Sequence, residues 1–198
     1  MGPRLRPQGR GRGLRRRRAG LAGGPVPPGR SARAGPLKLV AVIADTHLPR
    51  GARRLPERCV EWLRRADLIL HAGDVVGASA LEELRDFAPV EAVKGNVDEP
   101  ALQAVLPERL VVTVEGVRVG LVHVPGPRAG REERLVSWFP DCAAVVYGHT
   151  HVPQLERYRD AWIVNPGSPT ERRRAPGHSM ALLEVADEVL QLRVIPLS

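Results

Sequence analysis

Acidic residues are missing from the first 36 positions of this 198-residue chain, which contain ten arginines among many glycines and prolines. The formal net charge of +8 comes from this segment, and residues 37–198 carry only about −2. The composition of this nearly neutral part does not indicate a basic nucleic-acid surface. Because residues 1–36 have few large apolar side chains, we expect them to form a disordered extension, and residues 37–198 to form the folded domain.

Four interpretations of the arginine-rich segment stay open. It is a disordered extension, a stretch translated from a start codon placed too far upstream, a salt-sensitive contact to a nucleic acid or another anionic surface, or a twin-arginine or organellar signal. The Gly/Pro-rich stretch after Arg18 lacks the apolar core of a signal peptide.

Long apolar runs and cysteine pairs are also scarce. No run of 18 apolar residues occurs, so we expect no membrane partner. Cys59 and Cys142 lie far apart, which is typical of reduced thiols in a cytoplasmic protein. Since no cysteine pair accompanies the histidines and no HExxH motif is present, a zinc finger and a metalloprotease of that class are excluded.

Strand-like and helix-like patterns alternate in the first half of the body. Short β-branched runs predict buried strands at 37–44, 67–71 and 90–93, and amphipathic patterns predict helices at 56–65 and 79–87. In the first helix, we expect Val60 and Leu63 to face inward. This βαβαβ order predicts a parallel sheet whose polar residues gather at the carboxyl ends of its strands.

The second half of the body predicts mostly strands. Two runs within 110–122 alternate around Gly116 and suggest a hairpin, and a helix is expected at 130–138. Further strands are expected at 143–147, 152–158, 161–165, 179–185 and 188–194. We therefore expect an α/β or α+β fold in layers, with a second sheet built largely from antiparallel strands late in the chain.

Histidines and carboxylates collect at the ends of the apolar runs. They form five short clusters: Asp45-Thr46-His47, Gly73-Asp74, Gly95-Asn96-Val97-Asp98, His123, and Gly148-His149-Thr150-His151. Because carboxyl ends of parallel strands share one edge of a sheet, we expect these side chains to meet. Imidazole, carboxylate and amide donors suit two neighbouring divalent cations, which indicates metal-assisted hydrolysis.

Each cluster is weak when taken alone. Asp45 and His47 lie two apart, so in an extended segment both would point to one side and reach one cation. Gly95-Asn96 is also a common turn pair, and a lone histidine such as His123 is more often structural. His71, on the strand leading to Asp74, is expected to be a core or supporting histidine.

The order and spacing of these clusters resemble those of the calcineurin-like metallophosphoesterases. With Asn165-Pro-Gly-Ser168 and the short length, the chain is most similar to their small bacterial and archaeal phosphodiesterase branch, which is related to a retromer subunit of the same fold. The resemblance covers about residues 38–195. It implies a four-layer α/β/β/α sandwich of two mixed sheets.

The resemblance also implies two divalent metal ions and their ligands. The first ion would take Asp45, His47, Asp74 and His151, and the second would take Asp74, Asn96, His123 and His149. Mn²⁺ is the expected metal, and Ni²⁺, Co²⁺, Zn²⁺ or Fe would suit the same donors. A hydroxide bridging the two metals would hydrolyse a phosphodiester substrate, and the catalytic roles fall to Asp74, Asn96 and His123.

Two positions depart from the family pattern. Val97 stands where many members have a histidine, and Val124-Pro125 follow His123 where the branch usually reads Gly-His. The second departure removes a candidate general acid, a group typically worth about 10²–10⁴-fold in rate. Arg128 or Arg131, in the adjacent loop, would be alternative phosphate-binding groups.

Two other functions remain in view. The alternative is a catalytically weak protein-interaction scaffold, like the retromer subunit. A nucleic-acid enzyme anchored by the arginine-rich segment is a third interpretation. The sequence also leaves a homo-oligomer open.

Overall fold

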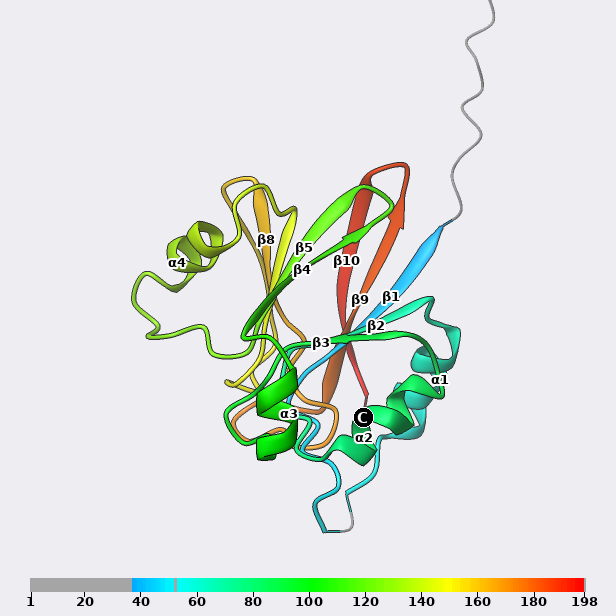
Figure 1. Ribbon diagram of the computed structural model, residues 1–198. Coiled ribbons are helices and arrows are strands. Elements are labelled where there is room, and N and C mark those ends of the chain that lie inside the picture. The colour runs from blue at the N-terminus through cyan, green and yellow to red at the C-terminus, as the bar shows by residue number, and fades with distance from the viewer. Residues whose placement is uncertain (1–36, 52, 198) are drawn as a thin grey trace, which may run out of the picture. The chain divides into compact units, whose positions relative to one another are not determined.

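The computed structural model describes residues 37–51 and 53–197, which form two mixed five-stranded sheets with helices on their outer sides (Figure 1). The expectation for residues 1–36 lies outside the described residues. In chain order the elements are β1 (Lys38–Ile43), α1 (Glu57–Arg65), β2 (Leu68–His71), α2 (Ala78–Arg85), β3 (Val90–Ala92), α3 (Pro100–Val105), β4 (Arg109–Val114), β5 (Val117–Val122), α4 (Arg131–Trp138), β6 (Ala144–Tyr147), β7 (Gln154–Tyr158), β8 (Ala161–Asn165), β9 (Ser179–Ala186) and β10 (Val189–Pro196).

The first sheet has the strand order β10-β9-β1-β2-β3. Strands β1, β2 and β3 run parallel, as the βαβαβ pattern predicts, while β9 and β10 are antiparallel. Residues 40–43 of β1 are fully buried because both faces of this sheet are covered. This explains why the strand appears in the sequence as a continuous apolar run.

The second sheet has the order β4-β5-β6-β8-β7 and differs from the sequence expectation. Strands β5, β6 and β8 are parallel, and only the edge pairs β4–β5 and β7–β8 are antiparallel. Helix α4 connects β5 to β6 and supplies the long crossover that a parallel pair needs. The late strands β9 and β10 return to the first sheet instead of extending the second.

Apolar side chains fill the space between the two sheets. Val42 and Leu183 of the first sheet belong to one buried cluster with Leu121 and Val146 of the second. Figure 1 shows α1 and α2 on the outer side of the first sheet and α4 on the outer side of the second. The four-layer α/β/β/α arrangement of two mixed sheets is therefore confirmed.

Three local expectations need correction. The hairpin turns through two residues, Glu115 and Gly116, whose φ angles of 44° and 83° match the left-handed pair of a type I′ turn. Helix α3 was not expected, because its six residues bury only Leu102 and leave no periodic pattern. Helix α1 buries Cys59 and Leu63, not Val60.

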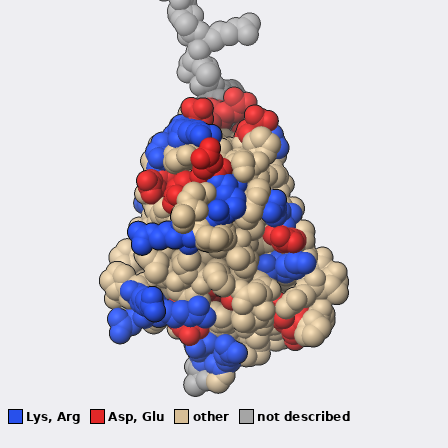
Figure 2. Space-filling model, turned by 90° about the vertical axis from the view of Figure 1, so that its left-hand side faces the viewer, with Lys and Arg blue, Asp and Glu red and all other residues tan. Residues whose placement is uncertain are grey.

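Charge and hydropathy on the described part agree with the near-neutral composition. Figure 2 shows that both acidic and basic side chains occur across the face in view, and that neither sign covers it. None of the helices in the described part of the chain has the length and apolarity that a membrane crossing demands.

The buried face of α1 can be tested with two truncations. Leu63→Ala should lower the free energy of unfolding by about 2–5 kcal/mol, because this fully buried side chain leaves a cavity among the α1, α2 and β1 residues. Val60→Ala should cost less than about 1 kcal/mol, because the side chain is only half-buried. Urea unfolding of the two variants measures both values, and equal losses would contradict this assignment of the buried face.

Candidate metal centre

The seven predicted ligands converge where parallel strands of both sheets end. Asp45 and Asp74 follow β1 and β2 of the first sheet, while His123 and His149 follow β5 and β6 of the second. Asn96 follows β3, and His47 and His151 lie two residues beyond Asp45 and His149. The structure therefore places near one another the residues that the strand-end argument named.

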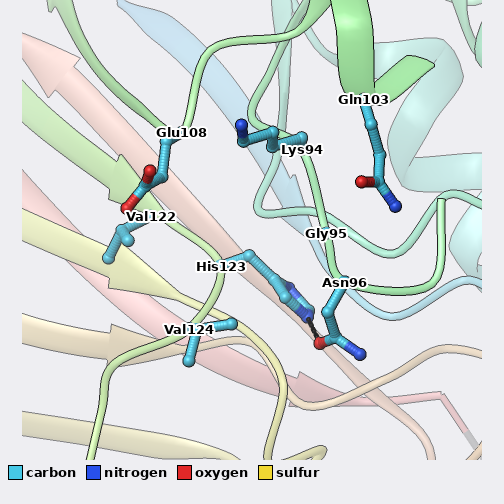
Figure 3. Close-up of a pocket in the computed structure, with 8 residues that line it drawn as sticks. All are labelled: Lys94, Gly95, Asn96, Gln103, Glu108, Val122, His123 and Val124. Atoms are coloured by element: carbon cyan, nitrogen blue, oxygen red, sulfur yellow. Dashed lines mark hydrogen bonds between the residues drawn. The ribbon is translucent and has the colours of Figure 1, made fainter. Parts of the chain in front are cut away.

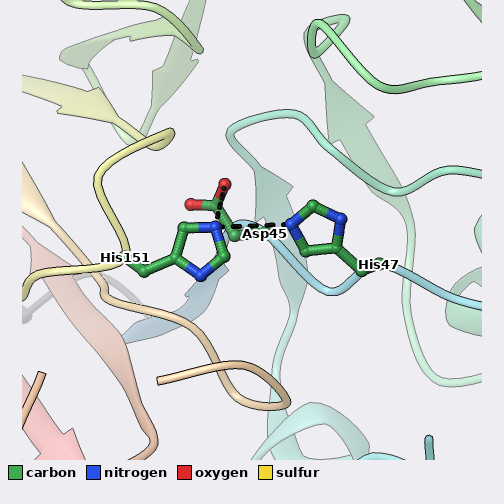
Figure 4. A group of neighbouring side chains, drawn as sticks. All are labelled: Asp45, His47 and His151. Atoms are coloured by element: carbon green, nitrogen blue, oxygen red, sulfur yellow. Dashed lines mark hydrogen bonds and ion pairs between the residues drawn. The ribbon is translucent and has the colours of Figure 1, made fainter. Parts of the chain in front are cut away.

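One group consists of Asp45, His47 and His151, all fully buried (Figure 4). The Nε2 atoms of His47 and His151 lie 3.3 Å apart. His151 Nε2 is 3.2 Å from Asp45 Oδ1. One donor atom from each residue lies within 4.8 Å of the others.

A second group lies beside the first. Asp74 Oδ2 is 3.2 Å from His123 Nε2 and 3.8 Å from His47 Nε2, so one oxygen faces imidazoles of both groups. Asn96 Oδ1 lies 3.1 Å from His123 Nε2, a contact visible in Figure 3, and 2.9 Å from His149 Nδ1. One donor atom from each of Asp45, Asp74 and His123 also lies within 4.8 Å of the others, so Asp45 belongs to both groups.

Backbone carbonyls fix the orientation of two of the imidazoles. His123 Nδ1 lies 2.8 Å from the carbonyl oxygen of Ala72, and His151 Nδ1 lies 2.6 Å from that of Glu171. A carbonyl only accepts, so each Nδ1 carries the hydrogen and each Nε2 is left to face the group. Ligands at about 2.1 Å from one cation lie about 3.0–3.5 Å apart, so the observed spacing fits a metal.

The backbone at the ligands is not extended, contrary to the reasoning from Asp45 and His47. Left-handed φ angles between 47° and 70° occur at Asp45, His47, Asp74, His149 and His151. Such a conformation costs a non-glycine residue of order 1 kcal/mol or more and persists only where surrounding contacts hold it. Here the amide N–H groups of Asp45 and His47 donate to Gly73 and Asp74 carbonyls, each at 3.0 Å.

Glycines allow the strand ends to approach one another. A Cβ atom on Gly95 would lie 2.1 Å from the amide nitrogen of Asp74, and one on Gly73 would lie 2.7 Å from the Cβ of His123. Neither contact is compatible with an alanine in the same backbone. The glycines that flank the clusters are therefore required by close packing between the loops.

Sequence reasoning gave no role to several residues that hold the loops in place. Asp98 accepts hydrogen bonds from the backbone N–H groups of Val76 and Gly95, at 2.7 and 2.6 Å. Asn165 Nδ2 donates to the carbonyl of Gly148 at 3.1 Å. Both residues stood in recognised clusters, each two or three residues from a glycine, and a polar side chain that close to a glycine is the sequence signal that points to such a role.

The two loop arginines do not reach the candidate metal centre. Arg131 stacks on the Tyr147 ring, with the guanidinium carbon 5.4 Å from the ring centroid, and with Arg128 it lines a hollow of ≈ 400 Å³ that none of the predicted ligands lines. A smaller groove of ≈ 210 Å³ beside His123 is lined by Lys94 and by the 44% exposed Val124 (Figure 3). Among the described residues, Lys94 is therefore one cation that shares a groove with candidate ligands.

The surroundings shift the pKa values of the ionisable groups at the site in different directions. Burial raises the pKa of Asp74, but the adjacent His123 and the Val97 N–H outweigh it and bring this pKa to about 2. Burial lowers the pKa of His47 and of His149. For His123 and His151 burial also acts downward, but the carboxylates of Asp74 and Asp45 prevail and raise the pKa.

Comparison with known proteins shows to which protein family the chain belongs. A model described as "Calcineurin-like phosphoesterase superfamily domain" matches residues 39–188. A Methanocaldococcus jannaschii relative named "Probable metallophosphoesterase" is 37% identical over 162 residues, covering 80% of this chain and 81% of that protein. The fold and the sequence thus define a metallophosphoesterase domain. The chain belongs to the calcineurin-like phosphoesterase superfamily, and within it to the small prokaryotic branch.

Solved structures share the fold. A Thermotoga maritima protein solved by solution NMR aligns with a TM-score of 0.64 and 28% identity, covering 80% of this chain and 99% of that one. Vps29 from Entamoeba histolytica, solved with Zn²⁺, aligns with a TM-score of 0.61 and 26% identity, covering 81% and 99%.

His71 should make folding depend on pH. Burial, and secondly the nearby His123, lower its pKa from 6.5 to about 3. Between these values the unfolded chain takes up a proton that the folded chain does not, so stability should fall as the pH falls, by about 1 kcal/mol per pH unit. His71 Nε2 lies 3.0 Å from Thr46 Oγ1, and the side-chain amide of His71→Gln reaches about the same position, so this variant keeps the polar partner and should lose the slope. Urea unfolding of the metal-free wild type and of the variant at pH 5.5 and 6.5 measures the free energy of unfolding. The same change between the two pH values in both proteins would contradict this role of His71.

Proposed function

We propose that the protein is a metal-dependent phosphoesterase that hydrolyses phosphodiesters with two divalent transition-metal ions, of which Mn²⁺ is the expected one. The observation that carries the proposal is the convergence of buried imidazole nitrogens, 3.3 Å apart in the case of His47 and His151, beside two carboxylates. The superfamily membership supports hydrolysis, and the Zn²⁺ complex of the Vps29 neighbour supports metal binding by a protein of this fold.

We assign the ligands in two sets. Asp45, His47, Asp74 and His151 hold one cation, and Asp74, Asn96, His123 and His149 hold the other, with Asp74 shared. Bound here, two divalent cations supply a water of lowered pKa as the nucleophile and neutralise charge on the phosphoryl oxygens. Only two of the seven ligands are anionic, so about two positive charges remain to attract a phosphodiester anion.

The side chains around the groove decide how the leaving group departs. Val124 follows His123 and has no proton to donate, so esters of poor leaving groups should react slowly. Lys94 lines the same groove as His123 and Asn96, where its side chain can attract the substrate's anion.

We extend the proposal to the domain organisation. All assigned ligands lie between residues 45 and 151, so residues 37–198 are the catalytic unit, and the arginine-rich segment 1–36 is not required for hydrolysis of small diesters. A contact of that segment with nucleic acid would be an addition to this unit and would be sensitive to salt.

Metal-stripped protein should hydrolyse bis-p-nitrophenyl phosphate only after Mn²⁺ is added, and faster than p-nitrophenyl phosphate. Asp74→Asn should lower kcat by about 10²-fold or more, because it removes the shared carboxylate. The initial rate of p-nitrophenol release measures both effects.

Asp141→Asn is the matched control for this substitution. Asp141 also has a left-handed backbone, with φ 62° against 58° at Asp74, but its carboxylate is exposed and paired with Arg118. It should keep the wild-type rate. No turnover with Mn²⁺, Ni²⁺, Co²⁺ or Zn²⁺ would exclude the enzyme and favour the scaffold alternative.

A further inference from the structure

Glu171 lies next to the candidate metal centre although no sequence pattern singled it out. It follows Asn165-Pro-Gly-Ser168 in the chain, and side-chain hydrogen bonds tie this part of the chain to the Asp45–His47 loop. Ser168 Oγ donates to the Asp45 carbonyl at 2.7 Å, and Thr170 Oγ1 donates to the Thr46 carbonyl at 2.6 Å. With the contact between His151 Nδ1 and the Glu171 carbonyl, the position of Glu171 is fixed relative to both imidazoles of the first group.

The side chain of Glu171 lies beside His47 but outside the two groups whose donor atoms are all within 4.8 Å of one another, so it has to move toward Asp45 and His151 to share their cation. Its Oε2 lies 3.6 Å from His47 Nε2, within the 3.2–3.8 Å range of the spacings among Asp45, His47, Asp74 and His151. This oxygen is buried and accepts no hydrogen bond from the described residues. It is therefore a carboxylate oxygen that has been desolvated without gaining a donor.

Two arginines lie near the Glu171 carboxylate. Arg53 Nη2 lies 3.3 Å from Glu171 Oε2, and Arg173 Nε lies 3.7 Å from Oε1. Neither contact is a hydrogen bond among the described residues, and Arg53 Nη1 is itself buried without a partner. The pairing is thus electrostatic and loose, unlike the arginine–carboxylate pairs that form two parallel hydrogen bonds.

We propose that Glu171 is a further ligand of the cation held by Asp45, His47 and His151, and that Arg53 competes with this cation for the Glu171 carboxylate. The inference rests on the proposed function only in requiring that the site binds metal. A third carboxylate strengthens the hold on this cation and reduces the positive charge available to the substrate. The carboxylate changes partner, from guanidinium to metal, when the site is loaded.

Metal binding to the full chain tests the inference without any measurement of turnover. Metal-stripped protein is titrated with Mn²⁺ by calorimetry, and free Mn²⁺ is followed by electron paramagnetic resonance. Glu171→Gln should weaken one of the two binding steps by about tenfold or more. Arg53→Ala should strengthen the same step by several fold, because a competing positive charge is gone.

Glu184→Gln is the matched control. Its side chain is 29% exposed against 27% for Glu171, and it also pairs with an arginine, Arg193, at 2.7 Å. It lies on β9, away from the assigned ligands, and should leave both binding steps unchanged. The thermal unfolding midpoint of each metal-free variant verifies that it is folded.

The opposite signs expected for the two variants separate ligation from loop anchoring. If the ion pair only holds the loop, Arg53→Ala and Glu171→Gln weaken Mn²⁺ binding alike, and the inference is wrong. An Mn²⁺ affinity of Glu171→Gln equal to that of the wild type also overturns it. In both cases the proposed function stands as long as the wild-type protein binds Mn²⁺. A wild-type protein that binds no Mn²⁺ overturns both.

Discussion

The close approach of His47 and His151 is the constraint on which the rest of the structure depends. Two ring nitrogens held 3.3 Å apart in a buried site, with Asp45 beside them, are unfavourable unless a proton or a cation lies between them. The contact joins a loop of the first sheet to a loop of the second. The strand ends, the glycines and the hydrogen bonds of the loops all serve to keep these groups together.

Local strain is balanced by contacts outside the ligand set. Left-handed backbones at Asp45, Asp74 and His149 would relax if the loops were free. Asp98 prevents this on one side by binding two backbone N–H groups, and Ser168 does so on the other by binding the carbonyl of Asp45. The polar residues around the ligands are therefore as necessary to the geometry as the ligands themselves.

Much of this arrangement could be predicted from the sequence, because strand periodicity and strand-end clusters depend on local patterns. The parallel strands β1, β2 and β3 and the meeting of Asp45, Asp74 and His123 follow from such patterns. The partners of β9 and β10 could not be predicted, since pairing between distant strands depends on which hydrophobic faces meet. Arg131 lies against the Tyr147 ring and Glu171 lies beside His47, and neither could be predicted because side-chain directions in loops are set by tertiary contacts.

The division of the ligands between two sheets has a consequence for the stability of the whole domain. A cation bound by Asp45, from the first sheet, and by His151, from the second, would cross-link the two sheets. Val42 and Leu121 fill the interface between these sheets. Such a cation binds only after both layers have assembled, so its binding free energy adds to that of folding. Removal of the proposed metal would then also weaken the packing between the two sheets and make the domain more susceptible to proteolysis.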